Sequence, residues 1–327
     1  MKTAEILVYF FAFVLLEWSY ILVARRLRII DKPNHRTMHS GQIVRGGGAL
    51  FVLAYCAYFI YSDNDNYFFL IGLLLLAAIS FIDDIRNLPG SFRLVFQVFS
   101  VVMMLYDVGI FEIWNWLFII SAIIIVTGVL NAFNFMDGIN GITAGYSCSL
   151  LLILLIINEQ LIKFADTNVI IFLLIGTLSF SVFNFRKRAL CFAGDVGSIT
   201  IGLIIAYLII NLIISSGSLL WILLLLIYGL DVVITIVQRI RNKENIFEPH
   251  RKHLFQVAIN RLNVSHLLVS TIYSVAQFLI GLIVLLIYSF QTEHQLLWAI
   301  VLMISGAAFY LIIKTKITGS VWLSDSY

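Results

Sequence analysis

Long apolar stretches separated by short polar connections run through almost the whole chain, and they constrain its fold more than any other feature. A helix needs about 20 mainly apolar residues to cross the hydrocarbon core of a bilayer. We predict membrane spans at 4–24, 46–62, 67–82, 92–106, 113–131, 141–158, 168–184, 198–214, 219–238, 266–288 and 295–313. The expected fold is therefore an all-α polytopic integral membrane protein with about 11 transmembrane helices, forming a single domain over residues 1–327.

The composition excludes the other common classes of protein. Hydrophobic residues make up 61% of the chain and charged residues only 12%, whereas soluble domains have about 45–50% and about 25%. The net charge of +3 is too small for a nucleic-acid binder that depends on a basic face. The three scattered cysteines, without a CxxC spacing, indicate small buried side chains rather than disulfides or zinc ligands.

The distribution of Lys and Arg predicts how the chain is oriented, because these residues accumulate in cytoplasmic loops. Nineteen of the 21 Lys and Arg fall in alternate connections, and only Lys2 and Lys163 fall on the other side. This pattern predicts an external N-terminus and a cytoplasmic C-terminus. Basic residues follow the first apolar stretch and no small-residue cleavage site is visible, so a retained first helix is favoured over a signal peptide.

Acidic residues recur at span ends on the predicted cytoplasmic side. Asp83 and Asp84 close the third span. Because neighbours on a helix point about 100° apart, one can face a metal while the other meets a second reactant; the alternative is two solvated charges at a helix end. Asp231 has apolar residues on both sides, so it lies at some depth, where an ionisable group is costly without a role or a partner.

The segment 131–141 joins two spans and carries Asn131, Asn134 and Asp137 together with two glycines. Amide and carboxylate side chains with exposed backbone at a membrane surface can recognise a polar ligand. Turn chemistry is the alternative, since Asp-Gly and Asn-Gly favour turns. That alternative explains the glycines but neither of the two upstream asparagines.

Gly194-Asp195-Val196-Gly197-Ser198 precedes the eighth predicted span, 198–214, and would open its helix. Free N–H groups at a helix start suit a phosphate, and the carboxylate beside them can hold a divalent ion. An ordinary N-cap is the alternative. Further along, His250 and His253 would share a face if 250–262 is helical, but no third metal ligand is at hand, and this basic segment fits lipid phosphate better than zinc.

Taken in order, these segments resemble the polyprenyl-phosphate N-acetylhexosamine-1-phosphate transferases, the glycosyltransferase family 4 superfamily that includes the phospho-MurNAc-pentapeptide translocase and the WecA-like and TagO-like enzymes. The resemblance covers about residues 31 to 256. Its motifs are Asp31-Lys32-Pro33-Asn34-x-Arg36 with Gly46-Gly47-Gly48, Asp83-Asp84 with Leu88-Pro89, Arg93 and Gln97, Asn131 to Gly141, and Asn184-Phe185 with Phe192-x-Gly194-Asp195-Val196-Gly197-Ser198.

The resemblance implies transfer of an N-acetylhexosamine 1-phosphate, by default GlcNAc 1-phosphate, from a UDP-sugar to undecaprenyl phosphate. The products would be undecaprenyl-diphosphate-sugar and UMP, in the first membrane step of O-antigen, capsule or other surface glycan synthesis. It also implies Mg²⁺, with Mn²⁺ able to substitute, and a bacterial inner membrane with the active site facing the cytoplasm. The expected partners are the UDP-N-acetyl sugar, undecaprenyl phosphate and the lipid bilayer; a homodimer is left open.

The same resemblance implies roles for individual residues. Asp195 would bind the metal, while Asp83 and Asp84 would act on the lipid phosphate or support the metal, one of them as base. Asp137 and His253 would complete the catalytic group. The expected substrate-binding residues are Asp31, Arg45, Asn131, Asn134, Asn140, Asn184, Arg239 and Arg251.

Two departures from the family pattern narrow the prediction. The second Asp of the nucleotide loop is Asn140 here, and an amide can still hydrogen-bond uracil. The His-x-His-His stretch appears as His253-Leu254-Phe255-Gln256, which argues against the peptidoglycan translocase. Arg251 and Phe247 fit the WecA-like branch that initiates surface glycans.

A transporter or flippase of lipid-linked substrates is the main alternative, with intramembrane acids as ion sites. No internal pseudo-repeat is visible, however, and the acids cluster at one face rather than the midplane. An aromatic prenyltransferase would need Asp-x-x-x-Asp motifs, and a CDP-alcohol phosphotransferase an Asp-Gly-x-x-Ala-Arg signature. Neither pattern occurs at Asp83 or Asp137.

Overall fold

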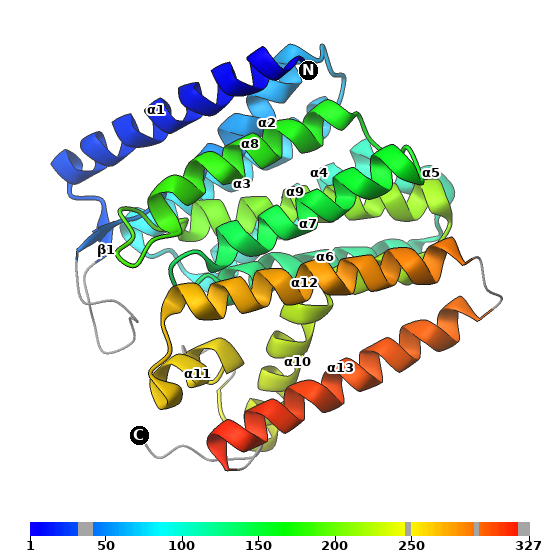
Figure 1. The fold of residues 1–327 in the computed structure, drawn as a ribbon. Helices are drawn as coiled ribbons and strands as arrows, with labels where there is room; N and C mark the ends of the chain where they lie inside the picture. The colour runs from blue at the N-terminus through cyan, green and yellow to red at the C-terminus, as the bar shows by residue number, and fades with distance from the viewer. Residues whose placement is uncertain (32–41, 246–249, 291–293, 320–327) are drawn as a thin grey trace.

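The computed structural model describes residues 1–31, 42–245, 250–290 and 294–319, and in this part the chain is a bundle of helices with one small antiparallel sheet at one end (Figure 1). The elements are α1 (Thr3–Leu27), β1 (Ile30–Asp31), β2 (Ile43–Val44), α2 (Ala49–Tyr61), α3 (Tyr67–Arg86), α4 (Gly90–Asp107), α5 (Ile110–Ile113), α6 (Trp116–Met136), α7 (Ile142–Gln160), α8 (Thr167–Asn184), α9 (Gly194–Ser216), the 3₁₀ helix η1 (Leu219–Leu225), α10 (Leu226–Arg241), α11 (Leu254–Leu262), α12 (His266–Ser289) and α13 (Gln295–Thr318). In the sheet, Ile30 pairs with Val44 and Asp31 with Ile43.

Among the described residues, 10 helical segments are long and apolar enough to cross a membrane, which confirms the predicted polytopic fold. The stretch predicted at 46–62 is the exception, because α2 has only 13 residues, or about 20 Å of helix. Its glycine-rich start is held outside the helix: Gly47 and Gly48 donate to the carbonyl groups of Phe192 and Ala193. A Cβ atom at Gly48 would collide with the backbone of Gly197, so the chain needs glycine at this crossing.

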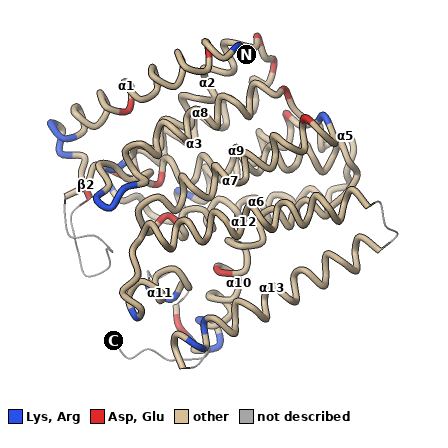
Figure 2. Tube along the Cα trace, viewed as in Figure 1, with Lys and Arg blue, Asp and Glu red and all other residues tan. Residues whose placement is uncertain are grey.

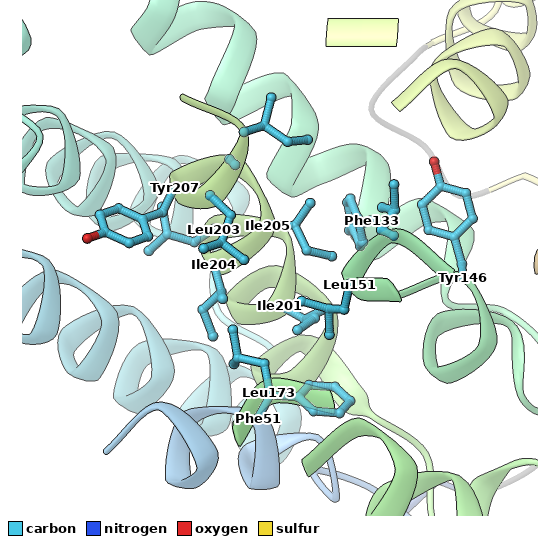
Figure 3. Packing of buried hydrophobic residues seen from close by; sticks show 14 of the residues in the cluster. Phe51, Phe133, Tyr146, Leu151, Leu173, Ile201, Leu203, Ile204, Ile205 and Tyr207 are labelled. Atoms are coloured by element: carbon cyan, nitrogen blue, oxygen red, sulfur yellow. The ribbon is translucent and has the colours of Figure 1, made fainter. Parts of the chain in front are cut away.

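Helix α9 forms the centre of the bundle. It is apolar on all sides and nearly all of its residues are buried, as expected for a helix surrounded by others. Figure 3 shows its side chains packed against residues from α2, α6, α7 and α8. The labelled residues are Ile201, Leu203, Ile204, Ile205 and Tyr207 of α9 and Phe51, Phe133, Tyr146, Leu151 and Leu173 of the surrounding helices. This packing fixes the helix whose first turn carries Asp195.

The charged residues are divided between the two ends of the bundle. Most Lys and Arg of the described part gather at the end that holds the small sheet and α11, whereas acidic residues dominate the end that holds the N-terminus and α5 (Figure 2). The alternating pattern of the sequence therefore corresponds to a real separation in space. Lys32, Arg36 and Phe247, which belong to the predicted motifs, lie outside the described residues.

Candidate active site

Three carboxylates from distant parts of the chain meet at the basic end of the bundle, and we call Asp83, Asp84 and Asp195 the carboxylate cluster. Asp83 and Asp84 are in the last turn of α3, and Asp195 is in the first turn of α9. Arg93 of α4 joins them, since its Nη1 donates to Asp83 Oδ2 at 2.8 Å and to Asp195 Oδ2 at 2.9 Å. The structure thus brings together the two acidic motifs that the sequence predicted.

Asp84 binds the free backbone N–H groups at the start of α9. Its carboxylate accepts hydrogen bonds from the backbone N–H groups of Asp195 at 2.9 Å and Val196 at 3.1 Å. These are the N–H groups that a helix leaves unpaired, at its positive end. Two sequence-based expectations are therefore wrong: these N–H groups are not free for a phosphate, and Asp195 is not the N-cap, because its side chain faces Arg93.

Arg45 brings a second positive charge to the carboxylate cluster. It follows β2, and its Nε lies 3.8 Å from Asp84 Oδ1 and 3.7 Å from Asp31 Oδ1. The side chains of Arg45 and Arg93 are 32% and 33% exposed, whereas that of Asp84 is fully buried. The site therefore combines a buried carboxylate with two guanidinium groups that are accessible to solvent, where they can bind phosphate oxygens.

Asp137 lies beside this cluster, directly after the end of α6. Burial raises the pKa of its carboxyl from 3.8 to about 7, while a hydrogen bond from the Thr143 hydroxyl opposes the shift. The charges of Asp84 and Arg45 also act on this pKa, in opposite directions. The carboxyl can therefore exchange a proton near neutral pH, a property expected of a group with a chemical role.

The two upstream asparagines of the 131–141 segment lie in the last turns of α6 and are partly accessible. Asn131 donates to the Gln97 side chain and to the Thr127 carbonyl, both at 2.8 Å. Asn134 accepts a weak hydrogen bond of 3.3 Å from Ser198, in the first turns of α9. Their position next to α9 is compatible with the predicted substrate contacts, and Asn134 has more free hydrogen-bonding capacity.

Asn140 and Asn184 are buried and hold backbone instead. Asn140 donates to the carbonyl groups of Arg186 at 2.9 Å and Lys187 at 3.2 Å, and its Oδ1 has no partner among the described residues. Asn184 accepts from the Gly141 N–H at 2.8 Å and donates to the Cys191 carbonyl at 2.9 Å. In this arrangement both amides connect the loops around the site, which differs from the direct substrate contacts that we expected from their motifs.

The C-terminal part supplies the last predicted residues. Helix α11 begins at Leu254, later than the predicted start at 250, and His253 is its N-cap residue. His253 is buried, and its Nδ1 lies 3.1 Å from Asp231 Oδ1. Arg239 is also buried and binds Glu244 and the Asn245 carbonyl, whereas Arg251 is partly exposed.

Some of the polar residues near the site were not singled out from the sequence. Thr143 binds Asp137, and Tyr273 and Tyr310 bind Asp231. Lys314 is buried although it was counted among the loop cations. The only signal in the sequence was the isolated acid Asp231 in an apolar run, which implied partners without naming them.

The carboxylate cluster has the donor chemistry of a magnesium site. Oxygens of Asp83 and Asp195 both lie within 3 Å of one cationic nitrogen, so a single cation can bridge them. Within the described residues no group of three or more His, Cys, Asp or Glu side chains is arranged to enclose a metal. Mg²⁺ at phosphate sites usually takes only one or two carboxylates and completes its shell with water and substrate phosphates. The residues present fit that mode of binding.

Comparison with known proteins agrees with this site. The model of glycosyl transferase family 4 matches residues 66–213, a region that includes the carboxylate cluster and Asp137. The chain is 25% identical to a probable undecaprenyl-phosphate N-acetylglucosaminyl 1-phosphate transferase of Bacillus subtilis, over 71% of this chain and 70% of that protein. It is 27% identical to the undecaprenyl-phosphate alpha-N-acetylglucosaminyl 1-phosphate transferase of Escherichia coli K12, over 71% and 69%, and 25% identical to that of Yersinia pestis, over 76% and 74%. Over residues 66–213 the chain is therefore similar to glycosyl transferase family 4, and over about 70% of its length to these transferases.

Proposed function

We propose that the protein transfers an N-acetylhexosamine 1-phosphate, by default GlcNAc 1-phosphate, from a UDP-sugar to undecaprenyl phosphate. The observation that carries the proposal is the convergence of Asp83, Asp84 and Asp195 with two partly exposed arginines at one end of a membrane bundle. Such a site can hold a divalent cation and two phosphate groups next to the bilayer surface. The relatives named above are transferases of this kind, which favours this function over a transporter or flippase.

In the proposed reaction a phosphate oxygen of the lipid attacks the sugar-bearing β-phosphorus. The bond from this phosphorus to the oxygen shared with the α-phosphate breaks, UMP leaves, and the sugar–phosphate bond is kept. Mg²⁺, held by Asp195 and Asp83, would neutralise the diphosphate charge. Arg93 would then be released from the two carboxylates, and with Arg45 it could bind phosphate oxygens.

The other residues would prepare the reactants. Asp84 is committed to the start of α9, so it keeps Asp195 in place. With Asp83 at the metal, Asp137 is the carboxylate better placed to take a proton from the lipid phosphate, and its pKa of about 7 suits this task. Asn131, Asn134 and the loop that Asn140 and Asn184 support would face the nucleotide and sugar.

The proposed location is the bacterial inner membrane, with the active site facing the cytoplasm and the N-terminus outside. The end that carries the carboxylate cluster also carries most of the Lys and Arg, and positive loops remain in the cytoplasm. UDP-sugars are cytoplasmic metabolites, so this orientation gives the site access to its donor. The first product would be a lipid-linked sugar for surface glycan synthesis.

A direct assay tests the proposal. Purified protein is mixed with undecaprenyl phosphate, Mg²⁺ and a panel of UDP-N-acetyl sugars, and UMP release is measured together with labelled sugar in the lipid phase. We expect equal amounts of both products with one sugar, no product without divalent metal, and a strongly reduced yield with Asp195→Asn. Asp63→Asn, at the opposite end of the bundle, is the matched control and should stay active. Folded protein that releases no UMP with any sugar would contradict the proposal.

A further inference from the structure

A buried polar network connects four helices of the C-terminal part, and we call Asp231, His253, Tyr273, Tyr310 and Lys314 the Asp231 network. All five residues are buried. Asp231 belongs to α10, His253 precedes α11, Tyr273 belongs to α12, and Tyr310 and Lys314 belong to α13. None of these residues is part of the carboxylate cluster, yet a buried carboxylate at this depth is costly without a role.

The groups that contact the Asp231 carboxylate, from the network and from the adjacent backbone, are hydrogen-bond donors. Oδ1 faces His253 Nδ1 at 3.1 Å, the Leu254 N–H at 3.0 Å and the Tyr310 hydroxyl at 3.0 Å, and Oδ2 accepts from the Tyr273 hydroxyl at 2.6 Å. Lys314 in turn lies 3.3 Å from the Tyr310 hydroxyl. Donors on both oxygens hold the carboxylate in one orientation.

This geometry determines which tautomer a neutral His253 ring adopts. A carboxylate oxygen at Nδ1 requires a proton on that nitrogen, so the neutral ring keeps its lone pair on Nε2. Nε2 is buried and has no partner in the described part of the chain. An unpaired buried nitrogen of this kind is unfavourable unless a ligand or a water molecule meets it.

The His253 ring lies next to the nucleotide loop. It packs against Phe255, with ring centroids 5.8 Å apart, and Phe255 occupies the space above Gly138, the residue after Asp137. The ring of Phe135, in the last turn of α6, is 6.4 Å away. Nε2 is therefore held beside the loop in which we place the UDP-sugar.

We propose that Asp231 is a positioning residue, which fixes the tautomer and the ring orientation of His253 so that Nε2 accepts a hydrogen bond from an N–H or O–H group of the UDP-N-acetyl sugar. This inference rests on the proposed function. Tyr273 and Tyr310 hold the Asp231 carboxylate, and α13 thereby contributes to the site through Asp231.

The test compares two replacements of Asp231 in the purified full-length protein. Asp231→Leu removes every acceptor, so we expect kcat to fall about 100-fold, the loss typical of a misplaced reactive group, with a smaller change in KM for undecaprenyl phosphate. Asp231→Asn keeps one acceptor for Nδ1–H and should remain within about tenfold of the wild type. Equal losses in both variants, or no loss in either, would overturn the proposal.

A double-mutant cycle separates positioning from simple support of the fold. If Asp231 acts through His253, then Asp231→Leu should cost less than about threefold in a His253→Ala background. The same 100-fold loss in both backgrounds would assign Asp231 a structural role instead. Thermal melts of Asp231→Leu and Tyr310→Phe provide a second measurement, and unfolding of both variants would also indicate a structural role. Wild-type protein that releases no UMP would refute the proposed function, whereas active wild type with insensitive Asp231 variants would refute only this inference.

Discussion

The carboxylate cluster and the Asp231 network are both built around buried aspartates, but they hold those aspartates in different ways. In the cluster, Asp83 and Asp195 share one nitrogen of Arg93, a side chain that is one third exposed. In the network, Asp231 is bound by hydroxyl, imidazole and backbone donors from neighbouring helices, and the side chains among these donors are buried.

The two sites differ in whether the groups bound to their carboxylates can be replaced. An exposed guanidinium between two carboxylates can move away when a cation with higher charge density arrives, so the cluster suits a partner that changes during turnover. The donors around Asp231 have no such freedom, because each is fixed by the packing of a helix. One site is built for exchange and the other for a constant geometry.

The largest expected effect comes from removing the negative charge of one aspartate in each site and comparing the loss of activity. Asp195→Asn should lower the rate of UMP release about 10³-fold, since it removes a charge that the transition state depends on. The equivalent Asp231→Asn change should cost less than about tenfold, because an acceptor is enough there. Parallel steady-state assays check both values. Similar losses in the two variants would remove the distinction between the sites.

The second prediction concerns metal binding in the absence of substrate. Arg93→Gln removes the cation that competes for Asp83 and Asp195, so Mn²⁺ should bind roughly tenfold more tightly. Mn²⁺ titrations followed by electron paramagnetic resonance can measure this, with Arg86→Gln at the exposed end of α3 as control. Unchanged or weaker Mn²⁺ binding would show that Arg93 does not occupy the metal position.

The third prediction is a pH dependence. The raised pKa of Asp137 keeps its carboxyl protonated below about pH 7, so kcat/KM should fall as the pH decreases through 7 if the carboxylate is the active form. Thr143→Val removes the hydrogen bond that favours ionisation, so this fall should move to higher pH by about 0.5–1 unit. A shift to lower pH, or none, would contradict the role of Asp137.

The smallest expected effect tests the redundancy of the network. Tyr273→Phe removes one of the donors to Asp231 and leaves the others, so kcat should fall less than about fivefold. The cost in unfolding free energy should be about 0.5–1.5 kcal/mol, the usual value of one hydrogen bond. Activity and denaturation assays on the same preparation check both numbers. A loss as large as that of Asp231→Leu would mean that the remaining donors cannot hold the carboxylate.

The helices could be predicted from the sequence because the length of an apolar run is a local property. The 46–62 stretch was overestimated, since the contact of Gly48 with Gly197 depends on a partner about 150 residues away. The same reason applies to the site. The motifs predicted which acidic residues belong to the site. Neither spacing nor periodicity shows that Asp84 caps α9 or that His253 lies next to Asp231. Pairings of this kind are created by the packing of the helices.

The attachment of α13 has a consequence for how the surrounding lipid acts on the protein. Its only buried residues are Tyr310 and Lys314, and its other residues, mostly apolar, are exposed or partly exposed along the 24 residues of the helix, which lies at the edge of the bundle (Figure 1). A helix of this kind adjusts its tilt to the hydrocarbon thickness of its bilayer. Its two buried residues are also members of the Asp231 network. We therefore expect a change in acyl-chain length that tilts α13 to shift Tyr310 and Lys314 and, through Asp231, the position of His253.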